Sequence, residues 1–273
     1  MFVDWQLFRR RALGMSLIAL VIVFIVWNIP QLNAVLYPFR LFVTFVHESG
    51  HGLAAILSGG EFVRFEVMAN GTGLATTRGG SRAAILPAGY LSAALFGAGL
   101  FFITNRVPYP RIIAVVLAAG LAALSLLFGQ TSQIALTVGL AFAVALTLIG
   151  LFASRYVVVF MLNVLAIITA LNAVLDLFFL TRNLDARTTE GRVLNDAAAF
   201  TLEIVPHTSV ALWAWLWAVI SIALLSYAVY RSLLKPLIED AMLASRRARR
   251  QPIVREVDPE PVYYDDYTPE YED

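Results

Sequence analysis

Apolar residues fill most of the chain in long runs, and short polar segments separate these runs. A helix needs about 20 residues to cross the hydrocarbon core of a bilayer, and most of the runs reach that length. The seven runs cover residues 12–28, 36–58, 82–104, 111–129, 134–153, 156–181 and 208–230. Backbone polar groups in lipid must be satisfied within their own segment, which favours helices. We therefore predict an all-α polytopic membrane protein with about seven transmembrane helices.

Two polar stretches interrupt this apolar pattern. The first, residues 59–81, alternates apolar and polar positions around Asn70-Gly71, which predicts a short β-hairpin between the second and third helices. The second, residues 182–206, carries a charged cluster. Its members are Asp185, Arg187, Glu190, Arg192 and Asp196. Neither stretch is long enough to form a separate domain.

The two ends of the chain differ from the apolar core. Residues 1–30 predict a retained N-terminal transmembrane helix, because no small-residue cleavage site follows the first run. Residues 31–230 form the expected membrane core. Residues 231–273 turn basic and then acidic, with Pro and Tyr, which is typical of a disordered tail. Its basic cluster is expected to flank the membrane, with a lipid- or partner-binding patch as the alternative.

Composition narrows the class of protein. Of the 273 residues, 59% are hydrophobic and 14% are charged, whereas a soluble domain carries about 25% charged residues. With no cysteine, thiolate metal sites and cysteine nucleophiles are excluded. A net charge of +1 gives no reason to expect nucleic-acid binding. We expect an integral, multi-pass protein of the cell membrane, with Arg9, Arg10 and Arg11 keeping the N-terminus cytoplasmic.

The second apolar run contains the motif His47-Glu48-Ser49-Gly50-His51. Residues i and i+4 of a helix lie on one face, so the two imidazoles can bind one metal ion. Glu48 beside them can accept a proton from a water molecule activated by that metal. Ionisable residues inside a membrane span cost roughly 2.5–3.5 kcal/mol each, and metal coordination offsets this cost. We therefore predict a metal site here rather than a chance match.

A tetrahedral catalytic zinc takes three protein ligands, so a third should come from another segment. Asp176 is the one carboxylate besides Glu48 that lies inside an apolar run, at a similar depth from its helix end. Asn172 precedes it by one turn and could donate a hydrogen bond to the developing oxyanion. An interhelical polar contact is the alternative for both residues. His207, the remaining histidine, lies at the edge of a segment and is poorly placed.

Taken in order, these motifs resemble the site-2-protease-like intramembrane zinc metallopeptidases, and most closely their compact B-like branch. The resemblance covers roughly residues 36–230. It rests on the His47–His51 motif, the Gly-rich hairpin, Ala88-Gly89-Tyr90-Leu91, and Asn172 with Asp176. It implies zinc held by His47, His51 and Asp176, with Glu48 as catalytic base. Leu177 follows Asp176 where better-known members carry Gly, and the chain has no room for a PDZ insertion.

The predicted function is zinc-dependent endoproteolysis of membrane protein substrates inside the bilayer. The hairpin could hold an unwound substrate as an added strand, or it could be an ordinary connecting turn. One alternative function is a catalytically idle scaffold that keeps the metal. Another is a metal or proton transporter, which should carry ionisable residues at several depths. Zinc is preferred for this donor set, although iron, cobalt and nickel also accept His and carboxylate.

Overall fold

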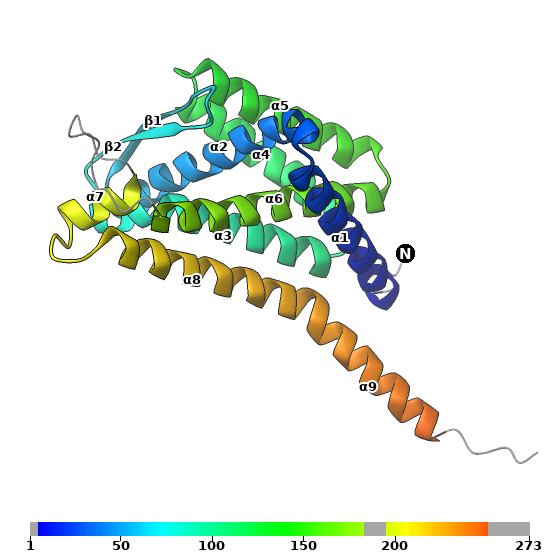
Figure 1. The fold of residues 1–273 in the computed structure, drawn as a ribbon. Coiled ribbons are helices and arrows are strands. Elements are labelled where there is room, and N and C mark those ends of the chain that lie inside the picture. Colours follow the sequence, from blue (N-terminus) through cyan, green and yellow to red (C-terminus); the bar gives the residue numbers. More distant parts are fainter. Residues whose placement is uncertain (1–4, 183–194, 251–273) are drawn as a thin grey trace, which may run out of the picture. The chain divides into compact units, whose positions relative to one another are not determined.

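The computed structural model describes residues 5–182 and 195–250. The chain divides into two compact units, Met1–Pro236 and Leu237–Asp273. The first unit is a helical bundle that carries one small β-hairpin (Figure 1). Its helices are α1 (Trp5–Asn28), α2 (Asn33–Leu57), α3 (Arg82–Arg106), α4 (Pro110–Phe128), α5 (Gln133–Phe152), α6 (Arg155–Arg182), α7 (Asp196–Glu203) and α8 (Val210–Val229).

Six helices in the described part of the chain are long and apolar enough to cross a membrane. They are Leu7–Asn28, Arg82–Arg106, Pro110–Phe128, Gln133–Phe152, Arg155–Leu180 and Val210–Leu243. This confirms the prediction of an all-α polytopic membrane protein. The run predicted at 36–58 is also helical, as α2, but it is not one of the six. Arg40 and the polar His47–His51 motif lower its hydropathy, which accounts for six candidate spans instead of about seven.

Helix α2 packs against α3 and against both strands of the hairpin. Phe42 and Phe45 on this helix are completely buried in the main apolar cluster. Close contact with α3 depends on Gly50, because a Cβ at that position would lie 2.8 Å from the carbonyl oxygen of Ala88. The two helices therefore approach each other backbone to backbone, as membrane helices do where small residues meet.

The predicted hairpin is present between α2 and α3. Strand β1 (Glu61–Val67) pairs antiparallel with β2 (Gly73–Arg78), and a bulge interrupts the register between Phe62 and Arg64. Phe65 is fully buried, which fixes β1 to the bundle. The turn is tied to α2, since the Thr44 hydroxyl donates to the carbonyl of Gly71 at 2.7 Å. These contacts leave the outer edge of β2 facing α2.

Helix α7 lies inside the polar stretch 182–206, where the sequence pattern predicted no element. Asn195 caps its first turn by accepting a hydrogen bond from the backbone N–H of Ala198 at 2.9 Å. The helix packs on α3 and α8. A second apolar cluster holds it there, in which Phe200 contacts the ring of Trp217.

The second unit contains most of α9 (Lys235–Arg250). The prediction of a disordered tail from residue 231 is wrong for this helix, since residues up to 250 are helical. Ala, Leu, Met, Glu and Arg dominate the segment, and all of them favour helix. Residues 251–273, to which the rest of that prediction refers, lie outside the described residues.

Candidate metal centre

His47 and His51 lie one turn apart on α2 and point their Nε2 atoms at each other. The two nitrogens are 3.0 Å apart, and the rings meet edge to face with centroids separated by 4.7 Å. Both side chains are largely buried, with 17% and 8% of their surface exposed. The i, i+4 spacing therefore brings the two imidazoles together on one face of α2, as the sequence predicts.

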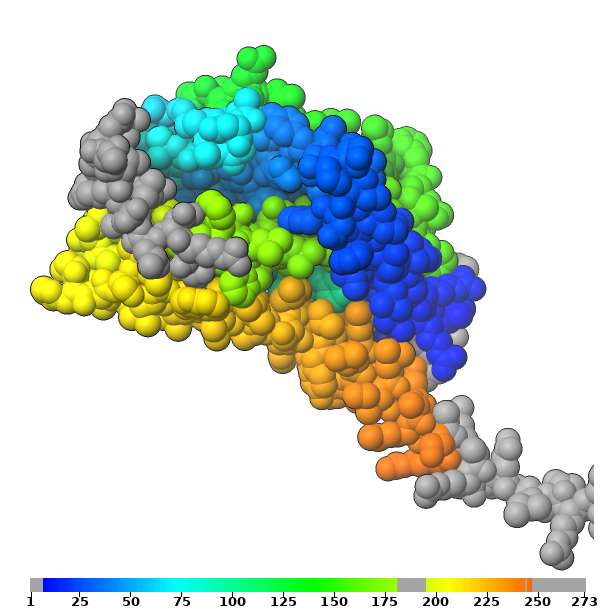
Figure 2. Space-filling model, in the orientation of Figure 1, coloured from blue at the N-terminus to red at the C-terminus, as the bar shows by residue number. Residues whose placement is uncertain are grey.

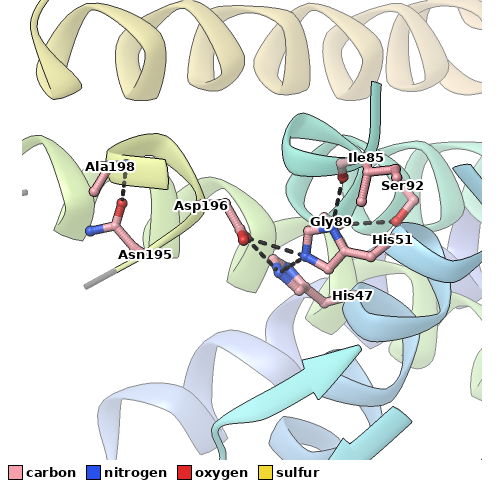
Figure 3. Close-up of polar contacts among 8 residues, drawn as sticks. All are labelled: His47, His51, Ile85, Gly89, Ser92, Asn195, Asp196 and Ala198. Carbon is pink, nitrogen blue, oxygen red and sulfur yellow. Dashed lines mark hydrogen bonds and ion pairs between the residues drawn. The ribbon is translucent and has the colours of Figure 1, made fainter. Parts of the chain in front are cut away.

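The carboxylate of Asp196, the first residue of α7, completes this cluster (Figure 3). Its Oδ2 lies 3.1 Å from Nε2 of His47 and 3.3 Å from Nε2 of His51. Burial would raise the pKa of Asp196, but the hydrogen bonds to His47 and His51 outweigh it and hold this pKa well below its usual range. Asp196 is therefore ionised at neutral pH.

The three donor atoms fit a zinc ion. Tetrahedral zinc with bonds of about 2.0–2.1 Å places neighbouring ligand atoms roughly 3.3 Å apart. The three separations here, 3.0, 3.1 and 3.3 Å, are close to that value. Two imidazoles and one carboxylate are also a ligand set used by catalytic zinc, and a fourth position stays available for water.

A contact with α3 orients one of the histidines. Nδ1 of His51 lies 2.7 Å from the backbone carbonyl oxygen of Ile85, so this nitrogen carries the proton and donates it. With the proton fixed on Nδ1, loss of the Nε2 proton would turn the lone pair of Nε2 towards the site, which is the tautomer that a metal needs.

The backbone of α3 passes directly over the imidazoles at Gly89. A Cβ at this position would lie 2.3 Å from Nε2 of His47 and 2.5 Å from Nε2 of His51. No side chain fits in that space. Gly89 thus leaves open the volume next to the three donor atoms.

Glu48, the predicted catalytic base, is buried beside these ligands, with 5% of its surface exposed. Its carboxylate accepts a hydrogen bond from the backbone N–H of Ala75 on β2. A Cβ at Gly73 would lie 2.5 Å from its Oε1 atom, so the strand and the carboxylate are in close contact. Glu48 is thereby held between the cluster of His47, His51 and Asp196 and the hairpin.

A cavity of about 460 Å³ connects these groups. One wall is the strand β2, with Gly73, Ala75 and Thr77, and the opposite wall is formed by α3 and α7. Tyr90 lines the cavity from α3 and places its ring edge to face against His47, with centroids 4.6 Å apart. The hairpin and α7 lie at the same end of the first unit (Figure 2, cyan and yellow).

The predicted site residues are only partly brought together. Asp176 lines the same cavity from α6 but does not belong to the group formed by the two histidines and Asp196. Asn172 does not line it, and its amide donates to the carbonyl of Ile168 one turn earlier in its own helix. His207 is exposed and outside the cluster, as expected.

The sequence does not point to Asp196, because this residue lies outside the apolar runs in which an intramembrane ligand is expected. Asp196 lies in the polar stretch 182–206, and nothing marks that stretch as intramembrane. A local signal was present. Asn195 followed by Asp196 and three alanines is an N-cap with an acidic first turn, which predicts a short helix.

Comparison with known proteins agrees with this geometry. The sequence model of the family described as Peptidase M50B-like matches residues 16–228. This range holds His47, Glu48, His51 and Asp196. No curated protein and no solved structure matches the chain. Since the family match spans well over half of the chain, this membrane protein belongs to the M50B-like peptidases.

Proposed function

We propose that the protein is a zinc-dependent endopeptidase that cuts membrane protein substrates within the bilayer. The observation that carries the proposal is the convergence of His47, His51 and Asp196 beside a buried glutamate. In this proposal Asp196, rather than Asp176, is the third ligand. Bound zinc would supply the Lewis acidity that activates water and polarises a peptide carbonyl.

Glu48 is the group best placed to move the proton. It follows a ligand directly in sequence, it is not part of the ligand group itself, and it lines the same cavity. In the proposed reaction Glu48 takes the proton of the attacking water and passes it to the leaving amine. His51 keeps its orientation throughout through its hydrogen bond to Ile85.

Replacing Glu48 by Gln is expected to abolish cleavage while the metal and the fold are kept. The amide has nearly the same shape but cannot accept the proton, and loss of a general base costs about 10²–10⁴-fold in rate. The measurement is the cleavage rate in proteoliposomes beside the zinc content of the same sample. Cleavage at the wild-type rate would exclude Glu48 as the base. Metal retained without cleavage would separate the enzyme from an idle scaffold.

The hairpin supports a second element of the proposal, in which an unwound substrate adds to β2 as an extended strand. Helical peptide bonds are shielded by their own hydrogen bonds, so the substrate must be extended for attack. The outer edge of β2 lines the cavity at Gly73, Ala75 and Thr77, on the side away from β1. An exposed strand edge is a general means of binding extended peptides.

Cysteine cross-linking tests this pairing, because the chain contains no native cysteine. In the Glu48→Gln background, Leu74→Cys is expected to form disulfides with single-cysteine substrates labelled near the cleavage position. Leu74 lines the cavity and is 55% exposed. Met68→Cys is the matched control, since Met68 is exposed on the same hairpin but does not line the cavity. Equal cross-linking from both positions would favour an ordinary connecting turn.

The transporter alternative has less support than proteolysis. Ionisable side chains that line the cavity gather around the metal ligands, whereas a transport path needs them at several depths. Zinc uptake into proteoliposomes that contain the protein would support the transporter function instead. The cell-membrane location and the cytoplasmic N-terminus stay predictions from sequence.

A further inference from the structure

The proposed ligands come from two separate elements of the fold. His47 and His51 are fixed relative to each other by one helix, α2, but Asp196 is carried by α7, which has only eight residues. The geometry of the site therefore depends on how α7 is seated. A slide of one residue along its axis would move Asp196 by about 1.5 Å. Such a shift would break separations that now lie between 3.1 and 3.3 Å.

The apolar contacts of α7 are poorly suited to fix its register. Its buried side chains are mostly alanines, namely Ala197, Ala198 and Ala199, with Phe200 as the one large anchor. A methyl group buries little area and offers little shape to resist sliding. Something else has to define the position of the helix along its axis.

One ion pair at the far end of α7 meets this need. Arg82, the first residue of α3, binds Glu203, the last residue of α7, through two hydrogen bonds. Nε donates to Oε2 and Nη2 donates to Oε1, each at 2.8 Å. This fork-to-fork geometry fixes direction as well as distance. The hydrogen bonds from Arg82 lower the pKa of Glu203, so the pair is charged at neutral pH.

Arg82 is also attached to the metal centre through its own helix. One turn further along α3, the carbonyl of Ile85 orients His51, and Gly89 passes over both imidazoles. Arg82 itself lines the cavity. The ion pair between Arg82 and Glu203 therefore ties α7, which carries Asp196, to α3, which orients His51.

We propose that Arg82 and Glu203 are positioning residues that hold α7 in the register in which Asp196 meets His47 and His51. This inference rests on the proposed metal site. The hairpin provides a comparison pair of the same residue types. Arg78 and Glu61 form a single contact at 3.0 Å, with 78% and 63% of their side-chain surface exposed, and neither lines the cavity. Removing that pair should leave the metal site unchanged.

The experiment compares Glu203→Arg and Glu203→Gln with the control Glu61→Arg, each in the full chain in lipid nanodiscs. The first readout is zinc affinity, measured by competition with a chromophoric chelator. The second is hydrogen–deuterium exchange of residues 196–203 in metal-free protein. We expect Glu203→Arg to weaken zinc binding about three- to tenfold and to speed exchange in α7. Glu203→Gln should act in the same direction but less, and Glu61→Arg should match the wild type in both readouts.

A charge swap provides the rescue. Arg82→Glu combined with Glu203→Arg should return α7 exchange towards the wild-type rate. It is measured by exchange alone, because a new carboxylate beside the cavity would itself attract metal. Wild-type zinc affinity in Glu203→Arg would overturn the proposal, whether or not exchange changes. If the wild-type protein binds no zinc, the proposed function fails, and the exchange measurement alone decides whether the bridge positions α7.

Discussion

Asp196→Ala is expected to empty the metal site, whereas Asp176→Ala is expected to leave it loaded. Loss of a residue that only orients a ligand costs about 10–100-fold in metal affinity, so loss of a ligand should cost more than about 100-fold. Asp176 lies in the same cavity but outside the ligand group. Its removal should change zinc affinity by less than about threefold, which corresponds to under 1 kcal/mol.

The measurement is zinc per chain by mass spectrometry of detergent-purified protein, with the affinity determined by chelator competition. Thermal unfolding of each variant establishes that it is folded. Asp196→Asn is a closer control, because it keeps the shape of the side chain and the start of α7. Zinc lost from Asp176→Ala and retained by Asp196→Ala would reverse the assignment and restore the ligand predicted from sequence.

Gly89→Ala should remove metal binding although none of the proposed ligands is replaced. The added methyl would lie 2.3 Å and 2.5 Å from Nε2 of His47 and His51, in the volume beside the donor atoms. Either the imidazoles rotate away or α3 moves, and overpacking of this kind costs about 1–3 kcal/mol of stability. In both cases the three-atom arrangement is lost, and zinc affinity should fall to that of Asp196→Ala.

Gly99→Ala is the matched control on the same helix. A Cβ at Gly99 has nothing within 4 Å, so alanine there should be neutral or slightly stabilising. Zinc content and unfolding temperature are measured for both variants. Full zinc occupancy in Gly89→Ala, with a wild-type unfolding temperature, would mean that the space over the imidazoles is not needed for the metal.

The sequence carries enough information for the parts of this site that depend on local periodicity. Helical spacing alone places His47, Glu48 and His51 together, and alternation around Asn70-Gly71 predicts the hairpin. Asp196 depends instead on how α7 folds back against α3 and α8, and no periodic signal encodes that. Asp176 is predicted as the third ligand because a carboxylate inside an apolar run is unusual, but it lies outside the group of His47, His51 and Asp196. The position of Asn172 shows the same limit, since a helix can satisfy a polar side chain through its own backbone.

The hydrogen bond between Ala75 and Glu48 links the binding of a substrate strand at β2 to the state of the proposed base. The backbone N–H of Ala75 faces away from β1, and a peptide that adds to β2 would need this donor for itself. If a substrate strand adds to β2 as proposed, it would compete with Glu48 for this N–H group, and pairing would release the carboxylate of Glu48 as a peptide bond arrives. Without substrate, Glu48 would remain hydrogen-bonded to Ala75. This would limit the activity of the proposed protease towards the other membrane proteins that surround it.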